Sequence, residues 1–387
     1  MTPIGGRNRW LAIALLMATS PSYGLSTGMV FPLLALALTE RGVDPQTVGI
    51  VTSMFYLGGF LAAFTFGGVV RWLGLRIGCI AAITLGGLAA ATFALPLSLL
   101  WLLVARLATG YSASAYYTAA DAWLGGLTRI EERGRIMGTS ESMRLAGLSI
   151  GPWLLLLLPA GYGFQAGAVI LLASVVPAWL AGPADTGNAT PAALPSLPFV
   201  RHNLAVLGVA FAGGSVVAGF NAYGAVVAQA TGLSAAGMAT LIWGGYAIGG
   251  VAQIALGTLG DRLGRMRVVS FATATGAAMA LTLMLAGRSG LALLLLGPCA
   301  VGMGISLYSL ALQRLIDRSA ASERVAAAAA TLIAYTFGAV LGPIAGGAAF
   351  ARVGALGLYA GLLAVLVLAS ALGALDHWLD RHRLPSH

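Results

Sequence analysis

The sequence of 387 residues contains no lysine, only two cysteines and few charged residues of any kind. Charged side chains make up 9% of the chain, whereas they make up about 25% of a typical soluble domain. Cys79 and Cys299 both fall inside apolar runs, so they predict neither a disulfide framework nor a metal site. This composition excludes a cytosolic enzyme, a secreted disulfide scaffold and a disordered chain.

Other residues that carry chemistry are missing from the apolar runs. The four histidines are His202, His377, His382 and His387, and none of them lies in the middle of an apolar run. We therefore expect no metal site and no cofactor, and we interpret the tail histidines with Asp376 and Asp380 as a solvated tail. The sequence has no phosphate-binding loop, which disfavours ATP-driven transport. Basic blocks interleaved with aromatics are absent too, so we expect no nucleic-acid partner.

What the sequence has in abundance is apolar surface. Hydrophobic residues make up 59% of it, and a further 54 residues are glycine. A bilayer-spanning helix needs about 20 apolar residues. The chain contains twelve such segments, at about 10–38, 47–70, 77–95, 99–123, 136–158, 166–183, 202–229, 237–260, 268–287, 291–313, 325–350 and 355–375. These segments predict an all-α integral membrane protein with twelve transmembrane helices.

The arginines predict the orientation of the spans, because cytoplasmic loops are enriched in basic residues. With the N-terminus placed inside, sixteen arginines fall on the cytoplasmic side. Only Arg41, Arg288 and Arg352 fall outside, and Arg106 and Arg144 lie within spans. We therefore expect both termini in the cytoplasm.

The longest polar break, with prolines at 183, 191, 195 and 198, falls at the midpoint of the chain. It predicts a cytoplasmic linker over 184–201 between two pseudo-symmetric six-helix bundles, 1–183 and 202–387. The halves also share motifs at a nearly constant offset. Gly67 and Gly74 recur 190 residues later as Gly257 and Gly264. A second pair of motifs is offset by 191. It consists of Gly138, Gly147, Gly151 and Pro152 in one half and of Gly338, Gly342 and Pro343 in the other.

These residues resemble motifs of the major facilitator superfamily of secondary transporters, over essentially the whole chain. The segment G-T-L-G-D-R-L-G-R-M-R, from 257 to 267, is similar to the family's loop after the second helix of a half. In the first half Arg71 stands where the family usually has aspartate. The Arg106-x3-Gly110 and Gly138–Pro152 patterns resemble the family's fourth-helix arginine motif and the fifth-helix glycine motif of exporters, although leucines replace the terminal glycine pair of the latter.

The resemblance gives both glycine motifs a role in alternating access. The loop motif implies a cytoplasmic gate, with close turns at its glycines and an ion pair at its charged residues; the gate residues are Gly67, Gly74, Arg76, Gly257, Asp261, Arg262, Gly264 and Arg265. The small residues of the fifth and eleventh spans suit a moving interface between the bundles, or ordinary close packing.

Charges within the spans are the leading site candidates, because a charge in the bilayer is costly. Glu141 and Arg144 are three residues apart on one helix and can pair. Glu141 is then a candidate proton carrier, or one partner of a permanent salt bridge. Arg106 and Asp121 lie about 22 Å apart along their helix and cannot pair directly, but both can face a cavity.

Polar and aromatic residues scattered over the spans could line a solute site. The candidates are Tyr23, Thr27, Asn221, Tyr223, Trp243, Tyr246, Gln253 and Tyr335. Packing or an interfacial aromatic belt explains each of them individually about as well.

We expect a monomeric transporter in a bacterial inner membrane, with the lipid bilayer and a small organic solute as its partners. Proton-coupled export is the leading hypothesis, and the fifth-helix glycine motif is the only reason to prefer it to uptake. A membrane-integral enzyme is disfavoured because the acidic pair Glu131–Glu132 has no histidine beside it. A receptor that shares the fold without transporting remains a third alternative.

Overall fold

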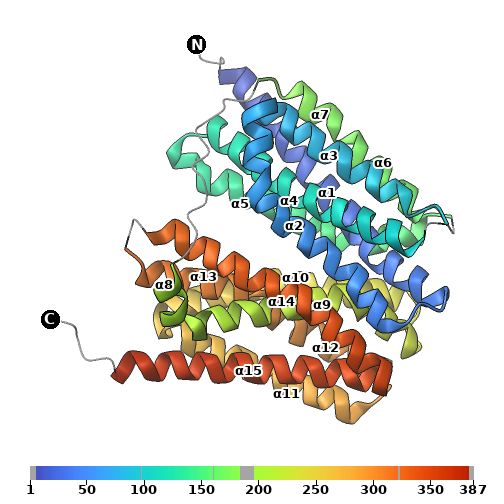
Figure 1. Ribbon diagram of the computed structural model, residues 1–387, viewed down its shortest axis with the longest axis vertical. Helices are drawn as coiled ribbons and strands as arrows, with labels where there is room; N and C mark the ends of the chain where they lie inside the picture. Colours follow the sequence, from blue (N-terminus) through green and yellow to red (C-terminus); the bar gives the residue numbers. More distant parts are fainter. Residues whose placement is uncertain (1–5, 97, 160, 184–195, 321–322, 383–387) are drawn as a thin grey trace. The chain divides into compact units, whose positions relative to one another are not determined.

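The computed structural model describes residues 6–96, 98–159, 161–183, 196–320 and 323–382, and the regular structure of these residues is helical (Figure 1). The long helices of the first half are α1 (Gly6–Glu40), α2 (Pro45–Leu73), α3 (Leu75–Thr92), α4 (Leu99–Leu127) and α5 (Ile130–Leu154), and the shorter α6 (Gly163–Ala173) and α7 (Val175–Leu180) follow. The second half contains α8 (Leu197–His202), α9 (Leu204–Ala230), α10 (Ala235–Leu263), α11 (Arg265–Ala286), α12 (Gly290–Ile305), α13 (Leu307–Arg318), α14 (Arg324–Val353) and α15 (Ala355–His382).

Each of the twelve expected segments coincides with a helix or a pair of helices, which confirms the all-helical membrane fold. The sixth segment is interrupted at Ser174, between α6 and α7, and the tenth at Ser306, between α12 and α13. The prolines Pro21, Pro32, Pro152 and Pro343 lie inside helices, as membrane helices tolerate.

Ten helical stretches of the described chain are long and apolar enough to cross a bilayer. The helices α4 and α5 are not among these ten, because polar and charged residues interrupt their apolar sequence. Arg106 and Asp121 lie on α4, and Glu141 and Arg144 lie on α5. The two long helices of the first half that are not among these ten are therefore the ones that carry Arg106, Asp121, Glu141 and Arg144.

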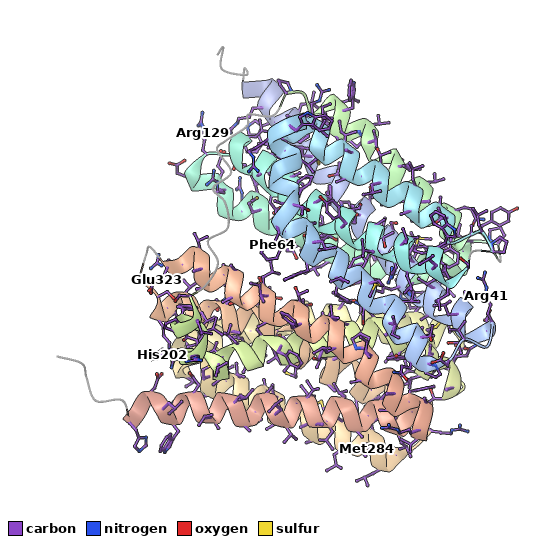
Figure 2. The ribbon with its side chains drawn as sticks, viewed as in Figure 1. Arg41, Phe64, Arg129, His202, Met284 and Glu323 are labelled. Atoms are coloured by element: carbon purple, nitrogen blue, oxygen red, sulfur yellow. The ribbon has the colours of Figure 1, made fainter. Side chains whose placement is uncertain are left out.

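The outer surfaces of the helices are strongly apolar. Trp72 is 84% exposed and Leu285 is 81% exposed, and many other large apolar side chains also project outward. Figure 2 shows Phe64 projecting from α2, whereas Arg129 lies at the turn between α4 and α5. Such apolar surface would be a liability in water and is what a hydrocarbon environment requires.

By its internal contacts the chain divides into two units, Met1–Leu34 with Met54–Pro191 and Ala35–Ser53 with Ala192–His387. The core of the first unit gathers around Tyr116 and Trp123 of α4. The core of the second unit gathers around α9, α11, α13 and α14, with Leu307 and Leu310 fully buried. In Figure 1, α15 (red) runs beside α11, and these two helices are in extensive contact.

The internal repeat has a structural counterpart in each unit. In the first unit Gly24 of α1 lies against the backbone of Arg144 and Leu148 in α5. In the second unit Gly214 of α9 lies against the backbone of Tyr335 and Ala339 in α14. These sets of residues are offset by 190 and 191, so the repeat preserves one close helix contact. Arg144 and Tyr335 therefore occupy equivalent positions in the two units.

The gate glycines Gly74 and Gly264 have φ values of +80° and +92°. Each lies between two helices, α2 and α3 or α10 and α11, which turn back on one another within a single residue. A residue with a Cβ rarely adopts this conformation, so the sharp turns expected at Gly74 and Gly264 are confirmed. Gly67 and Gly257 lie inside α2 and α10 instead and form no turn.

The expectation of a solvated tail after the last span is wrong at Asp376, whereas Asp380 and His382 are exposed and His387 lies outside the described residues. Helix α15 continues to His382, and Asp376 on it is buried. Its carboxylate accepts hydrogen bonds from Arg314, at 3.1 Å, and Arg318, at 2.9 Å, both on α13. The more exposed Asp380 pairs with the same two arginines. The four residues form one ion-pair network between α13 and α15, because Asp376 and Asp380 lie one helical turn apart.

Candidate functional site

The first candidate site brings four polar residues of the first unit together. Glu141 and Arg144 of α5 form the expected ion pair. The Arg144 guanidinium also lies 4.0 Å from the ring centroid of Tyr117 on α4, in a cation–π contact. Asp121 lies one turn after Tyr117 on α4, where the charges of both Arg144 and Glu141 act on it.

This site contains more acidic groups than basic groups. Arg144 is the single cation of the group, and two carboxylates and a tyrosine ring compete for it. The Glu141 side chain is 49% exposed and that of Arg144 is 25% exposed, so the pair is open to an approaching ion or solute. An accessible carboxylate held by one arginine can exchange a proton without a large rearrangement of the helices.

Arg106 is a buried charge of the first unit. It is 2% exposed, and its guanidinium lies 4.0 Å from the Phe31 ring and 5.0 Å from the Phe55 ring. Its Nε atom has no hydrogen-bond partner, and no carboxylate of the described residues forms an ion pair with it. Two aromatic faces partly compensate the charge, but they do not neutralise it.

A cavity of about 20 Å³ adjoins Arg106. Tyr23 and Thr27, both expected as lining residues, border it together with Thr109. This volume holds about one water molecule or one polar atom of a ligand. The structure thus brings Tyr23, Thr27 and Arg106 together around one small cavity. The sequence alone does not predict how far this group lies from the Glu141 site.

Tyr23 is also part of an aromatic cluster. Its ring stacks on that of Tyr116 with centroids 4.5 Å apart, and its hydroxyl is hydrogen-bonded to Ser112. Tyr117 contacts both rings edge-on, at 5.4 Å. Tyr117 also makes the cation–π contact with Arg144. The aromatic cluster therefore links the small cavity beside Arg106 to the Glu141 site.

In the second unit, two of the expected lining residues meet directly. The Tyr246 hydroxyl of α10 donates a hydrogen bond to the side-chain oxygen of Asn221 on α9. Tyr335 packs edge-on against Tyr308, with ring centroids 5.1 Å apart. Trp243 is 45% exposed and Gln253 is exposed, so neither is enclosed within its unit.

Tyr223 differs from the other lining candidates, because its hydroxyl is already hydrogen-bonded to backbone carbonyl groups. Its hydroxyl lies 2.8 Å from the carbonyl oxygens of both Pro45 and Pro343, and its ring stacks on Phe350. A hydroxyl held in this way braces helices. It has little capacity left for a solute.

The gate motif forms a network in the second unit. Arg265 pairs with Asp261 at 2.8 Å and with Asp317 of α13 at 2.5 Å, and it also donates to Gln313. Arg262 is exposed, and a Cβ at Gly257 would meet no heavy atom within 4 Å. In the first unit Arg76 instead donates to the Trp179 carbonyl at 2.6 Å and lies over the Trp179 indole ring.

The other motif glycines make close contacts within their own units. A Cβ at Gly151 would lie 2.7 Å from the Leu25 carbonyl oxygen, and one at Gly342 would lie 2.7 Å from the Ser215 Cα. Gly147 and Gly338 are held as tightly, against α1 and α9 respectively. Gly138 is different, because a Cβ there would meet nothing within 4 Å. Gly67 likewise has only the Arg71 side chain at 4.0 Å.

Several site residues were missed from the sequence. Phe31 and Phe55 lie on α1 and α2, and no sequence spacing connects them to Arg106. Asp317 and Gln313 lie about 50 residues after Arg265, so sequence spacing does not connect them to it either. Tyr117 could have been found, because it stands four residues before Asp121 and so shares a helix face with it. Among the described residues no cluster of three or more His, Cys, Asp or Glu side chains could hold a metal.

Comparisons with known proteins agree with this architecture. The family model of the Major Facilitator Superfamily matches residues 16–343. A bacterial homolog of the human lysosomal transporter Spinster, inward-facing and unoccupied, has the same fold, with a TM-score of 0.77 at 12% identity over 99% of this chain and 100% of that one. The nucleoside transporter NupG matches with a TM-score of 0.78 at 13% identity, over 96% of this chain and 100% of that one. A search of curated proteins found no match.

The family match covers well over half of the chain, and the structural matches span nearly all of it. The protein is thus a multi-pass membrane protein and not an enzyme, and it moves a small solute by secondary transport. The chain belongs to the major facilitator superfamily.

Proposed function

We propose that the protein exports a small organic solute in exchange for protons, and that Glu141 carries the proton. The observation that supports this most directly is the Glu141–Arg144 ion pair on α5, with Tyr117 and Asp121 as competing partners for the same arginine. The carboxylate is about half exposed, so a proton can reach it.

The exchange step involves proton transfer alone. A proton that binds Glu141 neutralises the carboxylate, and the ion pair with Arg144 loses its Coulomb attraction. The Arg144 charge is then balanced by Asp121 and by the Tyr117 ring. Release of the proton on the other side of the membrane restores the pair. A solute that interacts with Arg144 would compete with the carboxylate and so link its own binding to the proton.

Export is favoured over uptake because the glycine pattern of α5 resembles the fifth-helix motif of exporters. Gly147 and Gly151 hold the α5 backbone against α1, directly beside Arg144. A shift of α5 along α1 would therefore move the Glu141–Arg144 pair with it. Proton-coupled or facilitated uptake is the alternative, and the direction of flux separates the two.

The gate motif fits a latch on the cytoplasmic side, where we place both chain termini and the loops rich in arginine. Arg265 holds α10, α11 and α13 together through Asp261, Asp317 and Gln313. An exposed network of this kind contributes modestly to stability, so it can break and reform during transport. We place the protein in a bacterial inner membrane.

Proteoliposomes under an imposed pH gradient test the proposal. The solute would first be identified by a thermal-shift screen of metabolites and antimicrobials against the purified protein. Export by antiport predicts uphill solute movement in inside-out vesicles only when a gradient is imposed. Glu141→Gln should abolish uphill movement, whereas solute counterflow, which needs no net proton movement, should survive.

The matched control is Glu131→Gln, an identical substitution ten residues earlier on α5 at an exposed position. It should leave uphill transport within about twofold of the parent. Flux that ignores the gradient in the parent protein would refute proton coupling. Uphill transport that persists in Glu141→Gln would refute Glu141 as the carrier. Solute that moves with the proton would establish uptake.

A further inference from the structure

The second unit contains a partly open cavity of about 280 Å³ that is lined by its own helices. Helices α9, α10, α11, α12, α14 and α15 all contribute to its wall. Most of the side chains that face it are aliphatic or aromatic, among them Val216, Phe220, Leu283, Val301, Leu341 and Leu362. The proton-exchange proposal involves none of these residues.

The cavity wall has no charged side chain among its lining residues, and only three of them carry a hydroxyl. The Ser215 hydroxyl donates to backbone oxygens of Phe211 and Gly338. The Tyr223 hydroxyl is held by Pro45 and Pro343. Tyr359 is different, because it is only 5% exposed and its hydroxyl has no hydrogen-bond partner among the described residues.

The size of this cavity indicates a ligand. Protein interiors pack densely and rarely leave a void much larger than a water molecule. Small-molecule sites begin at about 300 Å³, close to the volume found here.

Two glycines leave part of this space open. Gly219 on α9 and Gly361 on α15 line the cavity, and a Cβ at either position would meet no heavy atom within 4 Å. Gly147, Gly151, Gly338 and Gly342 are needed for close backbone contact, but these two glycines are not. Larger side chains at positions 219 and 361 could therefore enter the cavity without displacing a neighbour.

We propose that this cavity binds one uncharged aliphatic chain. A charged headgroup has no partner in this wall, and a sugar or nucleoside would leave several polar groups unpaired. An aliphatic chain leaves no polar group unpaired when it enters a cavity with an apolar wall. The bilayer supplies such chains as lipid tails, and a long-chain alcohol has the same chemistry in free form.

Photolabelling of the full-length protein in nanodiscs tests this proposal. The probe is a sixteen-carbon alcohol with a diazirine at mid-chain, and mass spectrometry locates the cross-links. We expect labelled peptides from α9, α14 and α15, and competition by unlabelled hexadecanol. A second arm uses a phosphatidylcholine with the diazirine on its sn-2 chain. Labelling of these peptides by both probes identifies lipid tails as the occupant, and labelling by the alcohol alone identifies a free amphiphile.

Filled-cavity variants provide the decisive comparison. Gly219→Leu and Gly361→Leu should each reduce labelling of these peptides at least tenfold. The matched control is Gly250→Leu on α10, where a Cβ also meets nothing within 4 Å but which does not line the cavity. It should label like the parent. Thermal unfolding of each variant shows whether it is folded.

Undiminished labelling in both folded leucine variants would overturn the proposal. So would cross-links spread evenly over all lipid-facing helices. Both outcomes are independent of whether the protein exchanges protons.

Discussion

The hydroxyl of Tyr223 lies 2.8 Å from the carbonyl oxygen of Pro45, a residue 178 positions earlier in the chain. Pro45 begins α2 and belongs to the segment Ala35–Ser53, which is part of the second unit. Ser53 fixes the other end of this segment by donating to the Val340 carbonyl at 2.6 Å. Two side-chain hydroxyls thus attach a segment of the N-terminal sequence to α9 and α14.

We expect Tyr223→Phe to loosen this segment. The substitution removes the hydroxyl shared between the Pro45 and Pro343 carbonyls and leaves the stacking on Phe350 in place. The free energy of unfolding should fall by about 0.5–1.5 kcal/mol. Hydrogen–deuterium exchange should become faster over residues 45–53 and remain unchanged in α11.

The same substitution at Tyr359 is the control, because that hydroxyl is buried without a partner. Tyr359→Phe should leave stability unchanged or raise it slightly, since it removes an unsatisfied group. Equal losses of stability in the two variants would contradict the role assigned to Tyr223.

The repeated glycine contacts should be intolerant of a single methyl group. At Gly147 and Gly338 a Cβ would overlap the backbone of α1 or α9, which cannot move aside as a flexible side chain can. We expect Gly147→Ala and Gly338→Ala each to cost about 1–3 kcal/mol of stability, measured by unfolding in detergent. A helix would otherwise gain from this replacement.

Gly138→Ala on α5 is the matched control, because a Cβ there has open space. It should be neutral or stabilising by up to about 1 kcal/mol. If Gly138→Ala proves as damaging as Gly147→Ala, close packing does not explain the glycine pattern of α5.

The α13–α15 network should depend far more on Asp376 than on Asp380. Asp376→Asn leaves Arg314 and Arg318 without their buried counter-charge, and the expected loss is about 3–5 kcal/mol. Asp380 has a side chain that is 37% exposed, so Asp380→Asn should cost less than about 1 kcal/mol. Thermal unfolding of the two variants side by side measures the difference. Similar losses would show that burial does not govern the network.

Arg106 should stabilise the protein less than a neutral side chain would. Its charge is buried without a carboxylate, and the Phe31 and Phe55 rings compensate it only in part. We expect Arg106→Met to raise the melting temperature by a few degrees, because it removes a buried charge without a carboxylate partner, and to abolish solute flux, because it removes the charge that adjoins the small cavity. Arg41→Met, at an exposed position, should change neither property. A fall in melting temperature for Arg106→Met would show that the arginine is a structural residue.

Much of the fold was predictable because its signals are local. A run of apolar residues specifies a spanning helix by length alone, and Gly74 and Gly264 could be recognised as turn residues from their place between apolar runs. The Glu141–Arg144 pair also followed from sequence, since residues three apart on a helix are neighbours. Its role in proton coupling stays a prediction.

Other features depend on contacts between distant helices, and sequence spacing does not encode those. Nothing in the sequence indicates that Phe31 and Phe55 enclose Arg106, or that Asn221 meets Tyr246. The tail was wrongly predicted at Asp376 for the same reason. Asp376 reads as a solvated charge until α13 is seen to bring Arg314 and Arg318 against it.

The equivalence of Arg144 and Tyr335 has a consequence for how the two halves can differ. Both residues contribute their backbone to the close contact with Gly24 or Gly214, and that contact involves no side chain. Their side chains are therefore free to vary while the helix pair stays the same. One half has placed a cation there and the other an aromatic ring, so a duplicated scaffold supports two different chemistries at a single geometric position. Exchanging those two side chains, by Arg144→Tyr together with Tyr335→Arg, would be the smallest change that tests whether each half can perform the function of the other.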